Sequence, residues 1–163
     1  MKLEQFKSIF DDYYNPIKNF LYYKLGDVDL AEDLTQEVFM KAWDKRNDIR
    51  LETVKSYLYA IAHNLTINHF KSAKNRFEFK FSEQEIVTAE SPHYIMERDE
   101  FGEQLTQAIA GLTESQRTAF LMNRIDDLTY VEIANCLKIS VKAVEKRMHG
   151  ALENLRVVVK QKF

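Results

Sequence analysis

Cations recur on one face of a helix that is predicted near the carboxyl end of the chain. Lys142, Lys146 and His149 share this face at helical spacing, and Arg147 lies at its edge. Side chains of these types bind the phosphates and the guanine edges of DNA. Residues 138–163 hold seven Lys or Arg against two Glu, although the whole chain has a net charge of −2. Because phosphate binding depends on local charge, this face is a candidate DNA-binding surface.

The cationic face belongs to the second helix of a predicted helix-turn-helix, a motif that places its second helix in the major groove. Thr129 and Glu132 have the spacing of a capping box, which starts the first helix, and Ser140 can cap the second. The inner sides of both helices are apolar. Their predicted contact residues are Val131, Ile133, Ala134, Leu137, Val144, Met148, Ala151, Leu152 and Leu155. The alternative is an ordinary amphipathic helix whose cations only face solvent.

The composition predicts an all-α protein. Of the 163 residues, 45% are hydrophobic and 29% are charged, and there are only 4 Gly and 2 Pro to interrupt helices. No apolar run has the length of a membrane span, and the first residues lack the apolar core of a signal peptide, so we expect a cytoplasmic protein. Cys136 is the single cysteine, and we expect a buried, inert thiol.

Residues 1–76 are predicted to form the first of two small helical domains. The hydrophobic spacing indicates helices over 3–25, 29–45 and 53–76. Pro16 should bend or divide the first helix, and Asp29 can cap the second.

The second of these helices is apolar on two sides, which is typical of the central helix in a bundle. A polar stripe between the two sides is either solvated or reserved for a partner, and it consists of Asp33, Gln36, Glu37, Met40 and Asp44. Asp33 and Glu37 could also be read as metal ligands. No second acidic or histidine pair at matching spacing supports that reading.

Polar side chains line one flank of the third helix. Tyr57, Asn64, Asn68 and Lys71 form a row, and Lys74 follows near the end of the helix. Such a row suits unpaired bases, because an aromatic ring can stack on them, amides can read their edges and cations can hold phosphates. The alternative is the polar border of an ordinary amphipathic helix.

An acidic linker is predicted over residues 77–95, which hold one Lys against four Glu. Residues 96–163 are predicted to form the second helical domain, with a helix over 96–110 and a capping box at Thr113 and Gln116 before the helix-turn-helix.

In this order, the motifs resemble a bacterial sigma factor of the extracytoplasmic-function (ECF) group over nearly the whole chain. The stretch from Ala31 to Trp43, A-x-D-L-x-Q-E-x-F-x-x-x-W, resembles the polymerase-docking helix of that family. The stretch from Tyr57 to Asn64, Y-L-x-x-I-A-x-N, is similar to its promoter-melting helix. L-T-Y-x-E-I-A from Leu128, followed by I-S-x-x-A-V-x-x-R from Ile139, resembles its reader of the minus-thirty-five element.

The resemblance implies a non-enzymatic specificity subunit without cofactor, metal or small-molecule substrate. Its implied partners are core RNA polymerase (the β′ clamp and the β flap), promoter DNA and an anti-sigma protein. The residues implied in polymerase docking are Asp33, Gln36, Glu37 and Met40. Those implied in minus-ten recognition are Asn47, Arg50, Tyr57, Asn64, Asn68, Lys71 and Lys74. Those implied in minus-thirty-five recognition are Thr129, Ser140, Lys142, Ala143, Lys146, Arg147 and His149.

Several positions depart from the family pattern. Tyr57 stands where Trp is common, Asn68 where Asp is common and Lys71 where Arg is usual. Glu145 replaces a frequent cation. Lys138 occupies the corner position where Gly is common, and a left-handed backbone there would carry a strain of roughly 1 kcal/mol.

Three other functions are compatible with parts of the chain. A dimeric helix-turn-helix repressor or activator would use the cationic face but gives the stripe from Asp33 to Met40 no role. A helical metalloenzyme would use Asp33 and Glu37 as metal ligands. In a purely protein-binding helical bundle, the cationic face of the last helix would be incidental.

Overall fold

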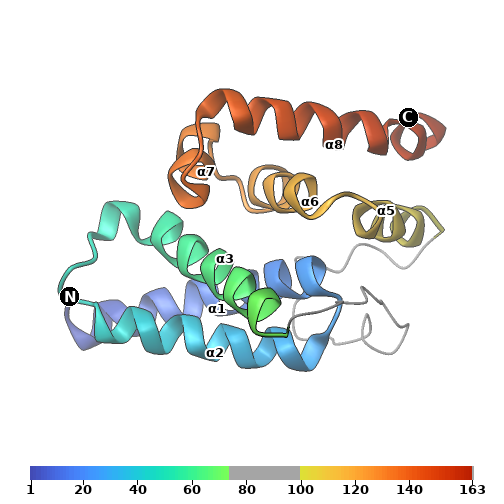
Figure 1. The fold of residues 1–163 in the computed structure, drawn as a ribbon. Coiled ribbons are helices and arrows are strands. Elements are labelled where there is room, and N and C mark those ends of the chain that lie inside the picture. Colours follow the sequence, from blue (N-terminus) through green and yellow to red (C-terminus); the bar gives the residue numbers. More distant parts are fainter. Residues whose placement is uncertain (74–99, 163) are drawn as a thin grey trace.

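The computed structural model describes residues 1–73 and 100–162, and it is built of helices throughout that part of the chain (Figure 1). The all-α prediction is confirmed. The predicted linker over 77–95 lies outside the described residues, as does Lys74. The elements are α1 (Leu3–Leu25), α2 (Val28–Asp44), the 3-10 turn η1 (Leu51–Thr53), α3 (Val54–Ala73), α5 (Glu100–Ala110), α6 (Glu114–Phe120), the π-turn η2 (Leu121–Ile125), α7 (Tyr130–Leu137) and α8 (Val141–Lys162).

The first group of helices contains α1, α2 and α3. α1 continues through Pro16 without dividing, and it ends at Gly26, whose φ of 74° lets its N–H donate to the carbonyl of Tyr22. The predicted cap of α2 was wrong by two residues. Asp27, not Asp29, caps the helix, and its carboxylate accepts from the N–H of Leu30 at 3.0 Å.

α2 is covered on two sides, as its sequence predicted. It packs against both α1 and α3. On the α1 side, Phe39 and Trp43 meet Phe6, whose ring centre lies 5.0 Å from that of Trp43. The guanidinium of Arg46 covers the ring of Trp43 at 3.9 Å from its centre. Among the described residues, the stripe between the two covered sides therefore stays exposed on α2.

The second group contains α5, α6, η2, α7 and α8, with α8 packed against α5, α6 and α7. The predicted capping box of α6 is present, since the hydroxyl of Thr113 accepts from the N–H of Gln116 at 3.2 Å. Arg117 is buried and donates to the carbonyls of Ile109, Ala110 and Leu112 at 2.7–3.1 Å, which satisfies the carboxyl end of α5.

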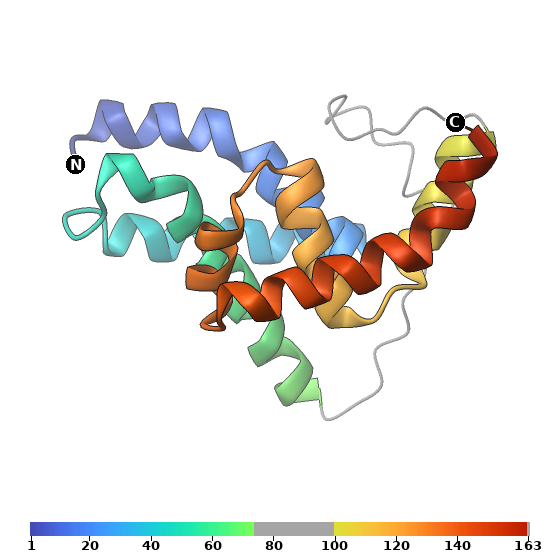
Figure 2. The same cartoon turned by 90° about the horizontal axis from the view of Figure 1, so that it is seen from above.

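The two groups lie directly on one another. α7 packs across α3, and α1 contacts α5, α6 and η2. Two perpendicular views show α7 lying against α3 (Figures 1 and 2). We call this relation the closed arrangement.

Candidate nucleic-acid and polymerase interfaces

The helix-turn-helix is formed by α7 and α8, and its ends are capped as predicted. The N–H of Glu132 donates to the hydroxyl of Thr129 at 3.1 Å, and the carboxylate of Glu132 accepts from the N–H of Thr129 at 2.8 Å. At the start of α8, the hydroxyl of Ser140 accepts from the N–H of Ala143 at 3.0 Å. Thr129, Ser140 and Ala143 thus have local structural roles beside any contact with DNA.

The corner between the two helices is formed by Lys138. Lys138 has φ 56° and ψ 47°, in the left-handed region, and its N–H donates to the carbonyl of Ala134. A side chain at this position costs roughly 1 kcal/mol relative to glycine. The cost is offset by the packing of the two helices that the corner joins.

The inner face of the motif is mostly as predicted. Fully or nearly fully buried are Ile133, Ala134, Val144, Met148, Ala151 and Leu155. Two predictions were wrong, because Val131 is 58% exposed and Leu152 is 37% exposed. Both residues lie at the border of the apolar face, where neighbouring elements decide burial.

The cationic face is open to solvent over most of its length. Lys142, Lys146 and His149 are exposed, whereas Arg147 is half-buried. A groove between α6 and α8 is lined by Lys146, Arg147 and His149, and Gln116 and Gly150 also line it. The geometry suits a negatively charged backbone at the surface of α8.

The predicted minus-ten row divides into an open part and a covered part. Asn64, Asn68 and Lys71 are exposed along α3, and Asn47 and Arg50 are exposed in the preceding loop. Tyr57 is half-buried and lines a pocket with Ser56 and Ala60 of α3 and with Asn135 and Cys136 of α7. The structure therefore separates Tyr57 from the rest of the row.

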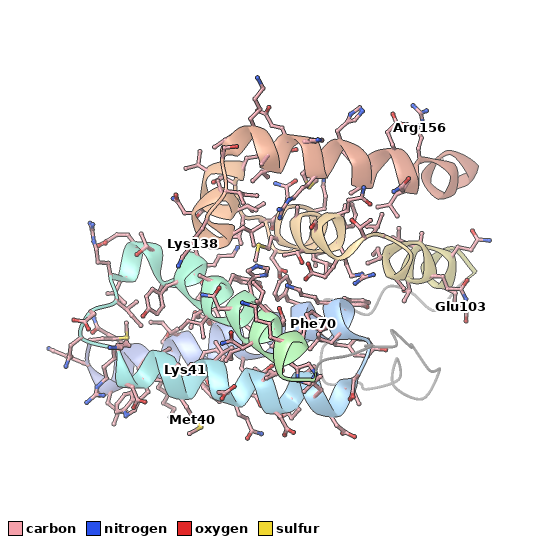
Figure 3. The ribbon with its side chains drawn as sticks, in the orientation of Figure 1. Met40, Lys41, Phe70, Glu103, Lys138 and Arg156 are labelled. Atoms are coloured by element: carbon pink, nitrogen blue, oxygen red, sulfur yellow. The ribbon has the colours of Figure 1, made fainter. Side chains whose placement is uncertain are left out.

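The predicted docking stripe on α2 is exposed along its length. Asp33, Gln36 and Glu37 face solvent, and Met40 is 67% exposed. Met40 projects outward from the bundle (Figure 3). An exposed methionine beside carboxylates offers a partner an apolar contact as well as charge. Within the described part of the chain, no group of three or more His, Cys, Asp or Glu is placed to hold a metal ion.

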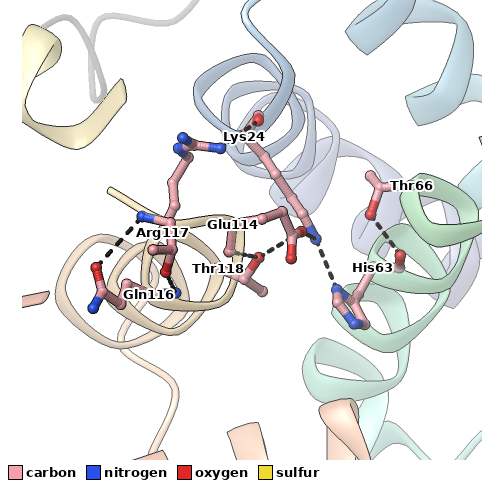
Figure 4. A network of polar contacts seen from close by, with 8 residues as sticks. Lys24, His63, Thr66, Glu114, Gln116, Arg117 and Thr118 are labelled. Atoms are coloured by element: carbon pink, nitrogen blue, oxygen red, sulfur yellow. Dashed lines mark hydrogen bonds and ion pairs between the residues drawn. The ribbon is translucent and has the colours of Figure 1, made fainter. Parts of the chain in front are cut away.

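A polar cluster around a buried lysine, between the two groups, was not predicted (Figure 4). Lys24, at the end of α1, is fully buried, and its Nζ lies 3.0 Å from Oε1 of Glu114 on α6 and 2.7 Å from Nδ1 of His63 on α3. An ammonium only donates, so Nδ1 of His63 accepts and the ring proton is on Nε2. We call Lys24, His63, Glu114 and Arg117 the Lys24 cluster.

The electrostatics of this cluster follow from burial. Burial lowers the pKa of Lys24 from 10.5 to about 8, and Glu114 offsets part of that effect. Burial, and then the neighbouring Lys24, lower the pKa of His63 to about 4, so its ring is neutral at neutral pH. Burial raises the pKa of Glu114, but Lys24, His63 and Thr118 together lower it by more, so the net pKa of Glu114 lies below its usual value.

Two sequence signals could have pointed to this cluster. Lys24 is the single charge in the apolar run from Phe20 to Leu25, and His63 stands between Ala62 and Leu65 on the core side of α3. A charged or imidazole side chain in such a place requires a buried partner.

Comparison with known proteins agrees with this geometry. Sigma-70 region 2 matches residues 9–76, and Sigma-70, region 4 matches residues 102–155. The RNA polymerase sigma-H factor of Pseudomonas aeruginosa is 30% identical over 138 residues, which cover 78% of this chain and 72% of that protein. The chain belongs to the ECF group of sigma factors. The ECF RNA polymerase sigma factor SigW of Bacillus subtilis is 29% identical over 167 residues, covering 94% of this chain and 88% of SigW.

A solved structure shares the fold. The sigma factor RpoE of Bartonella quintana, determined in complex with the anti-sigma factor NepR, superposes with a TM-score of 0.77 at 20% identity and covers 97% of this chain and 98% of RpoE. Sigma factors are transcription initiation factors, and the family is non-enzymatic. None of the helices described for this sigma factor is both long enough and apolar enough to span a membrane.

Proposed function

We propose that this sigma factor docks on core RNA polymerase through the stripe on α2, namely Asp33, Gln36, Glu37 and Met40. The observation that carries this proposal is that α2 buries its two other sides against α1 and α3 and leaves the stripe exposed. A carboxylate-rich surface with one exposed methionine suits a helical partner with basic and apolar side chains, such as the β′ clamp.

In the same proposal, the two helical groups divide the promoter between them. Residues 1–76 would bind polymerase and the minus-ten element, 96–163 would bind the minus-thirty-five element and the β flap, and 77–95 would link them. Exposed amides and cations on α3 and its preceding loop support the first assignment, and the exposed cations of α8 support the second.

The remaining expectations follow from the family. An anti-sigma protein is the proposed regulator, in keeping with the partner of the Bartonella protein. A chain that works with core polymerase would act in the cytoplasm, without catalysis or a cofactor of its own. The dimeric repressor or activator is less favoured, because it leaves the exposed stripe on α2 without a role.

Run-off transcription with purified core polymerase on a pool of promoter fragments tests the proposal. We expect specific starts only when the chain is added. Glu37→Lys should abolish them through loss of core binding, whereas Asp11→Lys, which changes an exposed carboxylate on α1, should not. Tight binding of the chain alone to palindromic duplexes, without stimulated transcription, would favour the dimeric regulator.

The double variant Lys146→Glu/Arg147→Glu separates DNA reading from polymerase docking. We expect it to bind core polymerase normally and to lose starts that depend on the minus-thirty-five element. Lys7→Glu, an exposed cation on α1, is the matched control. Unchanged starts in the double variant would contradict the role assigned to α8.

A further inference from the structure

A cavity lies inside the closed arrangement, where elements of both helical groups meet. Its volume is about 230 Å³, and α1, α3, η2 and the turn after η2 line it. None of its lining residues belongs to the docking stripe on α2 or to the residues assigned to DNA above, so the proposed function leaves this cavity without a role. The lining residues are Asp12, Tyr13, Pro16, Lys55, Tyr59, Ile125, Asp126 and Asp127.

The wall of the cavity carries more negative than positive groups. The carboxyls of Asp12, Asp126 and Asp127 line it, together with the ammonium of Lys55. Asp12 and Asp127 are exposed and therefore lie at the rim. Asp126 is only 5% exposed and belongs to the inner wall. A cationic ligand would therefore meet carboxyls at two depths.

The hydroxyl of Tyr59 is a second observation that points to a ligand. Tyr59 is fully buried in the inner wall, and its hydroxyl makes no hydrogen bond to any described residue. Burial and then the nearby Asp126 raise the pKa of this hydroxyl, although the two groups do not meet in a direct hydrogen bond. Buried hydroxyls are usually hydrogen-bonded. An N–H donor in the cavity would satisfy the hydroxyl oxygen and the carboxylate of Asp126 together.

Apolar side chains complete the wall. Tyr13, Pro16 and Ile125 are partly buried and line the cavity between the polar groups of α1, α3 and η2. A wall that combines carboxyls at two depths with apolar surface suits a molecule with an ammonium at each end of a short methylene chain. The volume corresponds to about seven water molecules at about 30 Å³ each. This is enough room for a four-carbon diamine.

A metal ion fits the cavity less well than an organic cation. Three Asp line it, yet no group of three or more His, Cys, Asp or Glu in the described ranges is placed to hold a metal ion. The carboxyls are therefore not gathered around one point, as the oxygen ligands of a single hard cation must be. Two linked ammonium groups can reach carboxyls that lie apart.

We propose that this cavity is a binding site for a small organic diammonium ion. One ammonium donates to the carboxylate of Asp126 and to the hydroxyl oxygen of Tyr59. The other lies at the rim beside Asp12 and Asp127, where charge-assisted hydrogen bonds hold it. The apolar side chains cover the methylene chain. The site is separate from the surfaces of the proposed function and does not depend on that function.

Binding at this site is linked to a proton. Burial raises the pKa of Asp126 to about 8, so its carboxyl is mostly protonated at pH 7 in the free chain. An ammonium beside a carboxyl favours the ionised form. The diammonium ion therefore displaces the proton of Asp126 as it binds. The charged and titratable groups that face Asp126 are Asp12 and Tyr13 on α1, Lys55 and Tyr59 on α3, and the neighbouring Asp127.

Isothermal titration calorimetry with putrescine, the four-carbon diamine, tests the site in the full chain without polymerase or DNA. In about 0.15 M NaCl, which screens adsorption to surface charge, we expect one putrescine to bind per chain with a Kd below about 1 mM. Titrations at pH 7 in buffers of different ionisation enthalpy should show the release of about one proton per putrescine. Butylamine, which has a single ammonium, should bind about tenfold more weakly. The neutral analogue 1,4-butanediol should not bind.

Three variants assign the binding to the cavity. Asp126→Asn should weaken binding about tenfold and abolish the release of the proton. It should stay folded, because it removes a buried carboxyl and keeps the shape of the side chain. Tyr59→Phe keeps the ring and should weaken binding about fivefold. Asp11→Asn is the matched control, since Asp11 is an exposed carboxylate beside Asp12 that does not line the cavity, and it should bind putrescine as the wild type does.

Three results would overturn the proposal. The first is the absence of saturable binding up to about 10 mM putrescine. The second is equal binding by the wild type and Asp126→Asn, which would mean adsorption to surface charge. The third is equal binding of butylamine and putrescine, which would mean that the rim holds no second ammonium. The sigma function stands in each case, because assays with core polymerase test it separately.

Discussion

Gly150 of α8 lies directly against Gln116 of α6. A Cβ on Gly150 would be 2.6 Å from Nε2 of Gln116, which is closer than the two atoms can approach. Gln116 closes the capping box of α6, and its Oε1 accepts from the side chain of Asn154 on α8 at 3.1 Å. The glycine thus allows α6 and α8 to approach each other at the base of the candidate DNA groove.

Replacement of this glycine should have two opposed effects. Gly150→Ala gains about 1 kcal/mol from helix propensity, but it displaces the end of Gln116 and weakens the cap, which costs about 1 kcal/mol. We expect little net change in the free energy of unfolding by urea. In a Gln116→Ala background, Gly150→Ala should stabilise the chain by about 1 kcal/mol. Equal effects in both backgrounds would contradict the contact.

Lys138→Gly should stabilise the helix-turn-helix. The left-handed backbone at Lys138 suits glycine, so the substitution should raise the free energy of unfolding by about 1 kcal/mol. Lys142→Gly, in the first turn of α8 with ordinary helical backbone, is the control and should destabilise the chain instead. Chemical denaturation of the three proteins checks both signs.

Asp126 should make stability fall as the pH rises. Burial raises the pKa of this carboxyl from 3.8 to about 8, and the nearby Asp127 adds to the effect. The folded chain therefore keeps a proton on Asp126 that the unfolded chain has lost, and this contribution is complete below pH 3.8 and disappears as the pH rises through 8. Asp126→Asn removes the titration. Its advantage over the wild type should grow between pH 4 and 8 to roughly 5 kcal/mol.

The measurement is the difference in unfolding free energy between the wild type and Asp126→Asn at several pH values. Contributions from His63 and other titrating groups cancel in that difference. A flat profile for Asp126→Asn would show that the carboxyl of Asp126 is not held protonated.

Arg117→Lys should destabilise the second helical group although it keeps the charge. Arg117 donates to three carbonyls at the end of α5. The ammonium of a lysine at this position lacks the forked guanidinium and cannot reach all three carbonyls. We expect a loss of about 3 kcal/mol in thermal or urea unfolding. Arg124→Lys changes an exposed arginine on η2 and should leave stability within about 0.5 kcal/mol of the wild type. Equal stability of the two variants would show that the carbonyl contacts contribute nothing.

The sequence predicted those parts of the fold that local chemistry decides. The capping boxes at Thr113 and Thr129 and the cap at Ser140 are present because a side chain and a backbone N–H three residues away settle them. Gly26 stops α1 for a similar local reason. The exposed stripe of α2 followed from helical periodicity alone.

The contacts between distant segments could not be predicted in this way. The pair Lys24–Glu114 joins residues far apart in the chain, and the burial of Tyr57 depends on where α7 lies. Periodicity reports which face of a helix is apolar but not which helix covers it. For the same reason, Val131 and Leu152 at the border of an apolar face were assigned to the core wrongly.

Trp43 gives the chain an optical probe at a useful place. It is the only tryptophan, and it lies at the carboxyl end of α2, half-buried, with the guanidinium of Arg46 on its ring. The charge and the water around an indole set the wavelength of its emission maximum, so binding of a partner at the end of α2 shifts that wavelength. Titration with a tryptophan-free peptide of the β′ clamp helices would therefore follow docking on α2 in unlabelled protein.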